Sequence, residues 1–175
     1  MLLRDIPYMS VLLGSVLFIA VPKTAGTSIA TILRNHGGKG FGHATVYEYP
    51  DLDKLFKFAF VRNPWDRFVS AYNHICPQKD FREVCLNPPS EIHFKPMYHF
   101  IDSVMDFVGR FESLEEDWAK VGEIIGIKDG LPHHRKYPHL DYRAYYTPET
   151  WDAVARYYAK DIEAFEYLQC QRATA

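Results

Sequence analysis

The chain has few cysteines and no long apolar run, and both absences narrow what it can be. The three cysteines, Cys76, Cys85 and Cys170, form no C-x-x-C pair, so a zinc site is not expected. Cys76 and Cys85 can pair across their loop in an oxidising compartment, whereas free thiols are expected in a cytoplasmic protein. The apolar stretch Val11–Val21 is too short to cross a bilayer as a helix. No membrane span is therefore expected.

The chain also lacks an excess of charge, internal repeats and low-complexity tracts. Its net charge is −2, which argues against a broad nucleic-acid surface. Hydrophobic residues make up 47% and aromatic residues 15% of the chain, as in a globular protein. A length of 175 residues predicts one domain over 1–175. The proline-containing stretch 76–96 is interpreted as a long loop region within that domain.

An apolar strand runs directly into a loop of small residues that carries one lysine. Residues 16–28 read Val-Leu-Phe-Ile-Ala-Val-Pro-Lys-Thr-Ala-Gly-Thr-Ser, which predicts Val16–Val21 as the first strand, at the centre of a sheet. Apolar residues then repeat at helical spacing from Ile29 to Leu33. A strand, a tight loop and a helix N-terminus aim several N–H groups and a dipole at one point, which suits an anion.

Lys23 adds a positive charge to this loop, while Ala25 and Gly26 allow the backbone to approach a ligand closely. The loop differs from the G-x-x-x-x-G-K-[ST] loop of nucleotide triphosphatases, because its lysine comes first, directly after Pro22. Two interpretations stay open on these residues alone. One is a phosphate-binding loop, and the other is a strand–turn–helix with an incidental surface lysine.

A second motif follows the next apolar run. Phe58–Val61 is predicted to be another buried parallel strand. Asn63 is a good N-cap, with Pro64 at the first helical position. The apolar residues of this helix mark its buried face, and its other face carries three polar residues: Asn63, Arg67 and Ser70.

Two side chains of this motif are candidates for holding one phosphate. Arg62 stands at the carboxyl end of the strand and Ser70 about two turns into the helix. Arginine offers a charged fork of donors, and serine offers a small hydroxyl donor. The alternative is an arginine in a structural ion pair and a serine at a solvated position.

Together the two motifs resemble sulfotransferases that use 3′-phosphoadenosine 5′-phosphosulfate (PAPS). The Pro-Lys-Thr-Ala-Gly-Thr-Ser loop resembles their 5′-phosphosulfate loop, and Arg-Asn-Pro-x-x-Arg-x-x-Ser resembles their 3′-phosphate element. Residues 107–118 and 145–167 resemble the carbohydrate-type branch, which contains the heparan and uronyl 2-O-sulfotransferases and many short bacterial proteins. This resemblance implies transfer of a sulfuryl group from PAPS to a hydroxyl, on a saccharide acceptor.

The alternation of apolar strands and helices predicts a three-layer α/β/α domain with a mainly parallel sheet, akin to nucleotide kinases. Its site is expected at the carboxyl edge of the strands. Residues 114–125 are predicted to present a core face, and residues 148–165 to form one packed C-terminal helix. Membrane-anchored relatives carry an extra N-terminal helix that this sequence does not show, so a cytoplasmic location is expected.

Donor-site roles follow from the resemblance. Lys23 is expected beside the bridging oxygen that leaves with the nucleotide. The 5′-phosphate is expected to be held by the N–H groups of five loop residues: Thr24, Ala25, Gly26, Thr27 and Ser28. The hydroxyls of Thr27 and Ser28 are expected to contribute as well. Arg62 and Ser70 are expected to hold the 3′-phosphate. No metal is required.

The acceptor hydroxyl needs a base, and a neutral imidazole suits that task. His43 lies between the two phosphate motifs, where the resemblance places a catalytic histidine, although a structural histidine is the alternative. His93, His133 and His134 are its competitors. The basic run 133–136, which ends at Lys136, falls where related chains close a loop over the donor; it can equally be a solvated charge run.

Two other functions stay open. One is an ATP-dependent small-molecule kinase of related fold, which is disfavoured because the loop lacks the Gly-Lys-Ser/Thr ending. The other is a non-catalytic nucleotide-binding protein that retains the donor site without an acceptor site. The sequence names neither the acceptor nor the oligomeric state.

Overall fold

The computed structural model describes residues 9–42, 45–49, 51–132 and 141–167, and the chain divides into two compact units. Unit 1 comprises residues 1–61 and 99–136, and unit 2 comprises residues 62–98 and 137–175. The single domain expected over 1–175 stays a prediction, since one domain can contain two such units.

Unit 1 contains a five-stranded sheet in the order β3-β1-β2-β4-β5. The strands are β1 (Ser10–Leu13), β2 (Val16–Ile19), β3 (Lys39–Phe41), β4 (Phe56–Val61) and β5 (Phe107–Arg110). The pairs β2–β4 and β4–β5 are parallel, whereas β1 is antiparallel to both β2 and β3. All strands except β1 therefore run in one direction, which confirms a mixed α/β fold with a mainly parallel core.

β1 is the strand that the sequence analysis missed. The apolar stretch Val11–Val21 is not one strand, because the chain reverses at Gly14 and Ser15 and Leu13 pairs with Val16. Gly14 has φ +56°, a conformation that glycine adopts readily in two-residue hairpin loops. β2 is thus central, as expected, but it is the second strand of the chain.

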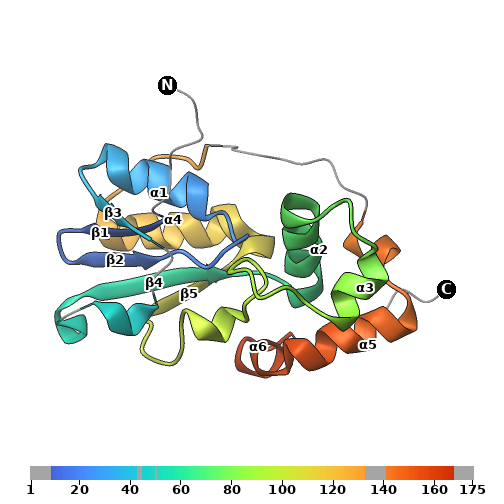
Figure 1. The fold of residues 1–175 in the computed structure, drawn as a ribbon. Helices are drawn as coiled ribbons and strands as arrows, with labels where there is room; N and C mark the ends of the chain where they lie inside the picture. Colours follow the sequence, from blue (N-terminus) through green and yellow to red (C-terminus); the bar gives the residue numbers. More distant parts are fainter. Residues whose placement is uncertain (1–8, 43–44, 50, 133–140, 168–175) are drawn as a thin grey trace. The chain divides into compact units, whose positions relative to one another are not determined.

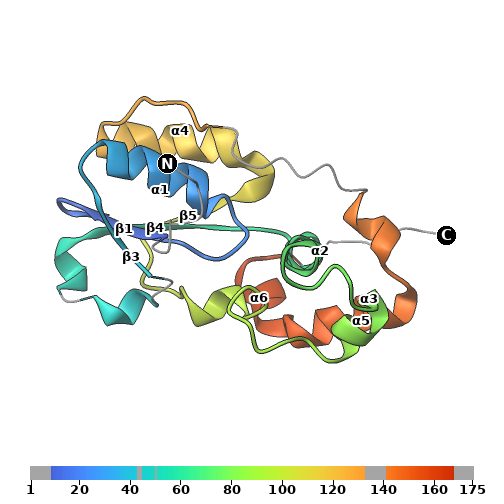
Figure 2. The same cartoon turned by 45° about the horizontal axis from the view of Figure 1, so that its top comes forward.

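Helices α1 (Gly26–Asn35) and α4 (Leu114–Ile125) cover the same face of this sheet (Figures 1 and 2). Their buried side chains form one apolar core with residues of three strands: Val11, Phe18, Ile29, Leu33, Phe58, Phe60, Trp118 and Val121. This packing confirms the core face predicted for residues 114–125. Unit 1 alone therefore supplies two layers, the sheet and one helical layer. Its short 3-10 helices are Val46–Glu48, Leu52–Lys54 and Phe111–Ser113.

Unit 2 is helical. Its helices are α2 (Pro64–Ile75), α3 (Phe81–Leu86), α5 (Pro148–Tyr157) and α6 (Ala159–Ala164). It also contains a 3-10 helix at Tyr142–Tyr145. A further 3-10 helix, Met97–His99, begins in unit 2, and its last residue belongs to unit 1. Trp65 and Trp151 stack with ring centroids 4.4 Å apart at the centre of its core. The stretch expected as a loop, 76–96, contains α3 and contributes buried residues to this core.

Two predictions about unit 2 are wrong, and a buried polar network explains both. Arg67 was expected on the polar face of its helix but is fully buried. It donates to the carbonyls of His93 at 3.3 Å and Lys95 at 2.7 Å, and its guanidinium lies 4.9 Å from the centre of the Tyr158 ring. A hydrophobicity pattern cannot foresee an arginine whose terminal nitrogens donate to carbonyls inside the core.

The single C-terminal helix is divided at Tyr158 into α5 and α6. The Tyr158 hydroxyl donates to the Phe94 carbonyl at 2.7 Å. Asp161, in α6, accepts from the N–H groups of Met97 at 2.7 Å and Tyr98 at 2.8 Å. Burial raises the pKa of Asp161, while Arg67 and the two N–H groups oppose that rise. We attribute the break to these contacts, because both anchors must reach the same segment, 94–98.

Cys76 and Cys85 are free thiols in the core of unit 2. Burial raises the pKa of Cys76, an effect that Lys79 partly offsets, and it raises the pKa of Cys85 to about 12. In a Cys170→Ser background we expect both thiols to resist a thiol reagent at pH 8 in the native protein and to react rapidly in denaturant. Mass spectrometry of the modified chain measures this, and rapid native labelling of Cys85 would contradict it.

Candidate functional site

The loop between β2 and α1 holds two non-glycine residues in the left-handed region. Lys23 has φ +70° and Ala25 has φ +69°, a conformation that costs residues with a Cβ of order 1 kcal/mol or more. Thr24, between them, is fully buried and donates to the Val21 carbonyl at 2.9 Å. Successive turns of this kind direct backbone N–H groups into an anion-binding concavity. The strained backbone is therefore what marks this loop as a candidate site.

Helix α1 begins without a side-chain cap. Ala25 is its N-cap, and its carbonyl accepts from the N–H groups of Ser28 at 3.0 Å and Ile29 at 3.3 Å. The N–H groups of Gly26 and Thr27 precede these first helical bonds and belong to the positions that an α-helix cannot satisfy internally. Together with the positive end of the dipole they favour an anion. The Ser28 N–H, by contrast, already has an acceptor inside the helix.

The hydroxyls expected at the 5′-phosphate have protein partners in this structure. Ser28 Oγ donates to the Pro132 carbonyl at 2.9 Å, and Thr27 Oγ1 donates to Met9 Sδ at 3.7 Å. A hydroxyl proton rotates readily toward another acceptor, so both roles stay predictions.

Gly26 has a packing role that the sequence analysis missed. A Cβ built on this residue would lie 3.0 Å from Met9 Cε and 3.4 Å from Ala20 Cβ. The small residue therefore lets α1 start close against the end of β2. Close approach of the backbone to a ligand stays a prediction for this position.

Arg62 follows the last residue of β4 and is buried. Its Nε donates to Asp66 Oδ2 at 2.8 Å in an ion pair, and its backbone N–H donates to Met97 Sδ at 3.4 Å. The ion pair considered as an alternative is thus present, but it does not exclude phosphate binding, because a guanidinium carries five N–H donors. Ser70 is half-buried on α2, and within the described residues its hydroxyl makes no hydrogen bond.

The N-terminus of α2 is closed by its own side chain, unlike that of α1. Asn63 Oδ1 accepts from the N–H groups of Trp65 at 3.0 Å and Asp66 at 3.2 Å, and Pro64 occupies the first turn. This confirms the predicted N-cap. Two of the backbone donors at the start of α2 are therefore already occupied, and a ligand there would depend on side chains.

The two motifs follow neighbouring parallel strands. Ile19 of β2 pairs with Ala59 of β4, so these strands end at the same edge of the sheet, the edge where ligands bind in open α/β sheets. Residues 23–28 belong to unit 1, whereas Arg62 and Ser70 belong to unit 2. Their meeting around one ligand is thus part of the proposal below.

Several predicted site residues lie outside the described residues: His43, Lys136, His133 and His134. His93 is described, and its role as an alternative base stays a prediction. Its carbonyl accepts from Arg67, and its ring lies 5.3 Å from that of His74.

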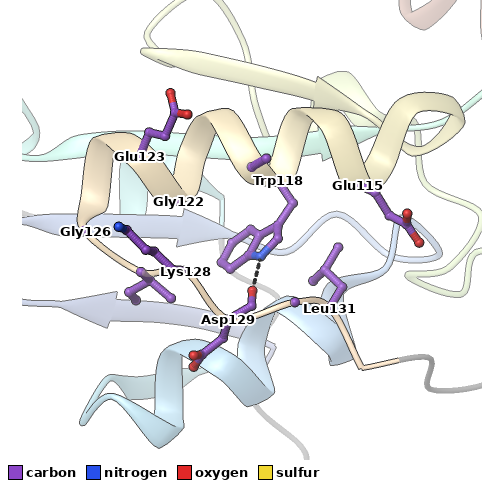
Figure 3. Close-up of a pocket in the computed structure, with 11 residues that line it drawn as sticks. Glu115, Trp118, Gly122, Glu123, Gly126, Lys128, Asp129 and Leu131 are labelled. Carbon is purple, nitrogen blue, oxygen red and sulfur yellow. Dashed lines mark hydrogen bonds between the residues drawn. The ribbon is translucent and has the colours of Figure 1, made fainter.

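A pocket of about 570 Å³ lies along α4, away from both motifs in the sequence (Figure 3). It is lined by α4 and the segment that follows it, up to Leu131. The Trp118 indole N–H donates to the Asp129 carbonyl at 2.8 Å and ties that segment to the helix. Among the residues that the structure describes, none of those predicted for the site lines this pocket.

The described residues contain neither a metal-binding cluster nor a membrane-spanning helix. No group of three or more His, Cys, Asp or Glu side chains is arranged there to hold a metal ion. None of the helices in the same ranges has the length and apolarity needed to cross a membrane.

Comparison with known proteins identifies the family. The model of the sulfotransferase family matches residues 14–168, which include the strained loop and the Arg62 motif. An uncharacterized protein of Archaeoglobus fulgidus is 31% identical over 115 residues, a match covering 58% of this chain and 85% of the relative. No solved structure gives a significant match. Because the family match spans nearly the whole chain and both candidate motifs, the protein belongs to the sulfotransferase family.

Proposed function

We propose that the protein transfers a sulfuryl group from PAPS to a hydroxyl group of a saccharide. The observation that carries this proposal is the loop between β2 and α1, with a lysine and an alanine held at positive φ before an uncapped helix. Membership of the sulfotransferase family supports sulfuryl transfer in general. PAPS as donor and a saccharide as acceptor are our finer proposals, the second resting on the resemblance to the carbohydrate-type branch.

The loop and α1 would hold the 5′ end of the donor. The N–H groups of Gly26 and Thr27 and the helix dipole suit its 5′-phosphate. Lys23 would lie beside the oxygen that bridges phosphorus and sulfur, where negative charge grows as the S–O bond breaks. A fixed cation at that point stabilises the transition state more than the ground state.

The Arg62 motif would hold the 3′-phosphate, which distinguishes PAPS from ATP. A guanidinium and a hydroxyl are a donor pair suited to a phosphate dianion. Arg62 comes directly after β4, the parallel neighbour of the strand that leads into the Lys23 loop. This succession of strands supports the proposal that the two motifs bind the two phosphates of one donor.

The reaction is an in-line displacement at sulfur. The acceptor oxygen forms a new S–O bond, the bond to the bridging oxygen breaks, and adenosine 3′,5′-bisphosphate leaves with the electron pair. The acceptor hydroxyl proton passes to a base, for which we propose His43. Positioning and electrostatic stabilisation are expected to supply most of the catalysis, as in the related phosphoryl transfers.

Nucleotide-dependent thermal unfolding tests the donor. We expect adenosine 3′,5′-bisphosphate at 100 times its Kd to stabilise the protein by about 2.7 kcal/mol, which raises Tm by roughly 5–10 °C. ATP with Mg²⁺ is the comparison, because a kinase would respond to it instead. Stabilisation by ATP alone would overturn the PAPS proposal. Transfer of labelled sulfate to a panel of saccharides and phenols then identifies the acceptor class.

A further inference from the structure

Arg62, Asp66 and Ser70 follow one another at intervals of four residues at the start of α2. Arg62 precedes the helix, Asp66 lies in its first turn, and Ser70 comes one turn later. Residues four apart on a helix are neighbours on its surface. Asp66 and Ser70 are therefore neighbours on α2, and Asp66 also contacts Arg62 through the ion pair.

Asp66 holds Arg62 by one particular nitrogen. Its Oδ2 accepts from Arg62 Nε at 2.8 Å, and the two side chains are only 16% and 7% exposed. The guanidinium is a rigid plane, so fixing Nε also fixes the directions of its two terminal nitrogens. The ion pair therefore orients the guanidinium fork, which binds phosphate best in a bidentate geometry.

The burial of the other Asp66 oxygen, Oδ1, is expected to lower the stability of the folded protein. Oδ1 is buried and has no hydrogen-bond partner among the described residues. A buried acceptor without a partner loses its hydration and gains nothing in exchange. An acidic residue in the first turn is explained by the helix dipole, but that effect does not require the carboxylate to turn inward onto Arg62. A buried polar atom that a native structure leaves unsatisfied calls for a specific explanation, and a role in function is one.

We propose that Asp66 is a positioning residue that orients Arg62 toward the 3′-phosphate and so sets the preference for 3′-phosphorylated nucleotides. The inference rests on the proposed function, since it assigns a role within the same donor site. Asp66 does not contact the donor itself. It acts through Arg62, and a change at Asp66 should therefore alter binding of the 3′-phosphate and leave the rest of the nucleotide unaffected.

The test is the preference for adenosine 3′,5′-bisphosphate over AMP, measured as the ratio of their Kd values by calorimetry. We expect Asp66→Asn, which keeps the shape of the side chain, to lower this preference at least tenfold with little change in Kd for AMP. In an Arg62→Ala background the same substitution should have no further effect, because its partner is gone. Glu149→Gln is the matched control, since it breaks the exposed Arg82–Glu149 pair of the same unit.

The outcomes separate the two proposals. If the unaltered protein bound both nucleotides equally, the proposed function would fail and this inference with it. A strong preference in the unaltered protein that persists or increases in Asp66→Asn would overturn the inference alone. Thermal unfolding of each variant shows whether it is folded, and an additional effect of Asp66→Asn in the Arg62→Ala background would also count against the inference.

Discussion

Replacement of Lys23 by alanine is expected to lower the rate of sulfuryl transfer by about 10²- to 10³-fold, the loss typical for one group that stabilises developing negative charge. The lysine would act where the bridging oxygen takes up charge, so the loss should appear in kcat. Binding of adenosine 3′,5′-bisphosphate should change much less, because its 5′-phosphate also has the N–H groups of α1. Alanine keeps a Cβ at a position with φ +70°, so the backbone strain of the loop is unchanged.

Labelled-sulfate transfer to the best acceptor of the panel measures this effect. Lys39→Ala is the control, since Lys39 is an exposed lysine of β3 in the same unit. Lys23→Arg keeps the charge but changes its geometry, and we expect it to retain more activity than the alanine variant. Near-normal kcat in Lys23→Ala would remove this lysine from the mechanism.

The largest effect on stability is expected from Asp161→Asn. Both carboxylate oxygens of Asp161 accept backbone N–H groups, from Met97 and Tyr98. Asparagine offers only one acceptor, and its amide N–H₂ would face the second donor. The substitution also removes the negative charge that acts on the buried Arg67. A buried N–H group left without its acceptor costs about 1–3 kcal/mol, and more where a charge is lost with it, which lowers the Tm of a chain of this size by roughly 5–10 °C.

Denaturant unfolding checks this prediction. Arg82→Ala is the comparison, because Arg82 and Glu149 form an exposed pair of good geometry. Exposed pairs contribute little to stability because water and salt screen them, so Arg82→Ala should shift the midpoint little. A change of similar size in both variants would show that the buried network does not carry the stability assigned to it.

The parts of the fold that the sequence predicts are those fixed by local rules. The strand, loop and helix around Lys23 follow from an apolar run, small residues and helical spacing. Asn63 and Pro64 fix the start of α2 by the chemistry of a helix N-terminus. For the candidate site, the motifs locate the loop and Arg62, and the family match supports sulfuryl transfer.

The parts that sequence reasoning misses depend on contacts between distant residues. Arg67 is buried because carbonyls of residues 93 and 95 accept its protons. The same network explains the break at Tyr158. The positive φ of Lys23 and Ala25 has no signal in the sequence, since neither is glycine. The Arg62–Asp66 pair, by contrast, could have been inferred from opposite charges four residues apart.

The hairpin of β1 and β2 has a consequence for how the chain folds. Leu13 pairs with Val16 across a two-residue turn, and such hairpins form in about 1–10 μs. The other neighbour of β2 is β4, in which Phe56 pairs with Val16, so this pairing must wait for a much longer loop to close. Synthesis proceeds from the N-terminus. The strand that leads into the Lys23 loop can therefore acquire its register on the ribosome before any residue of unit 2 has been made.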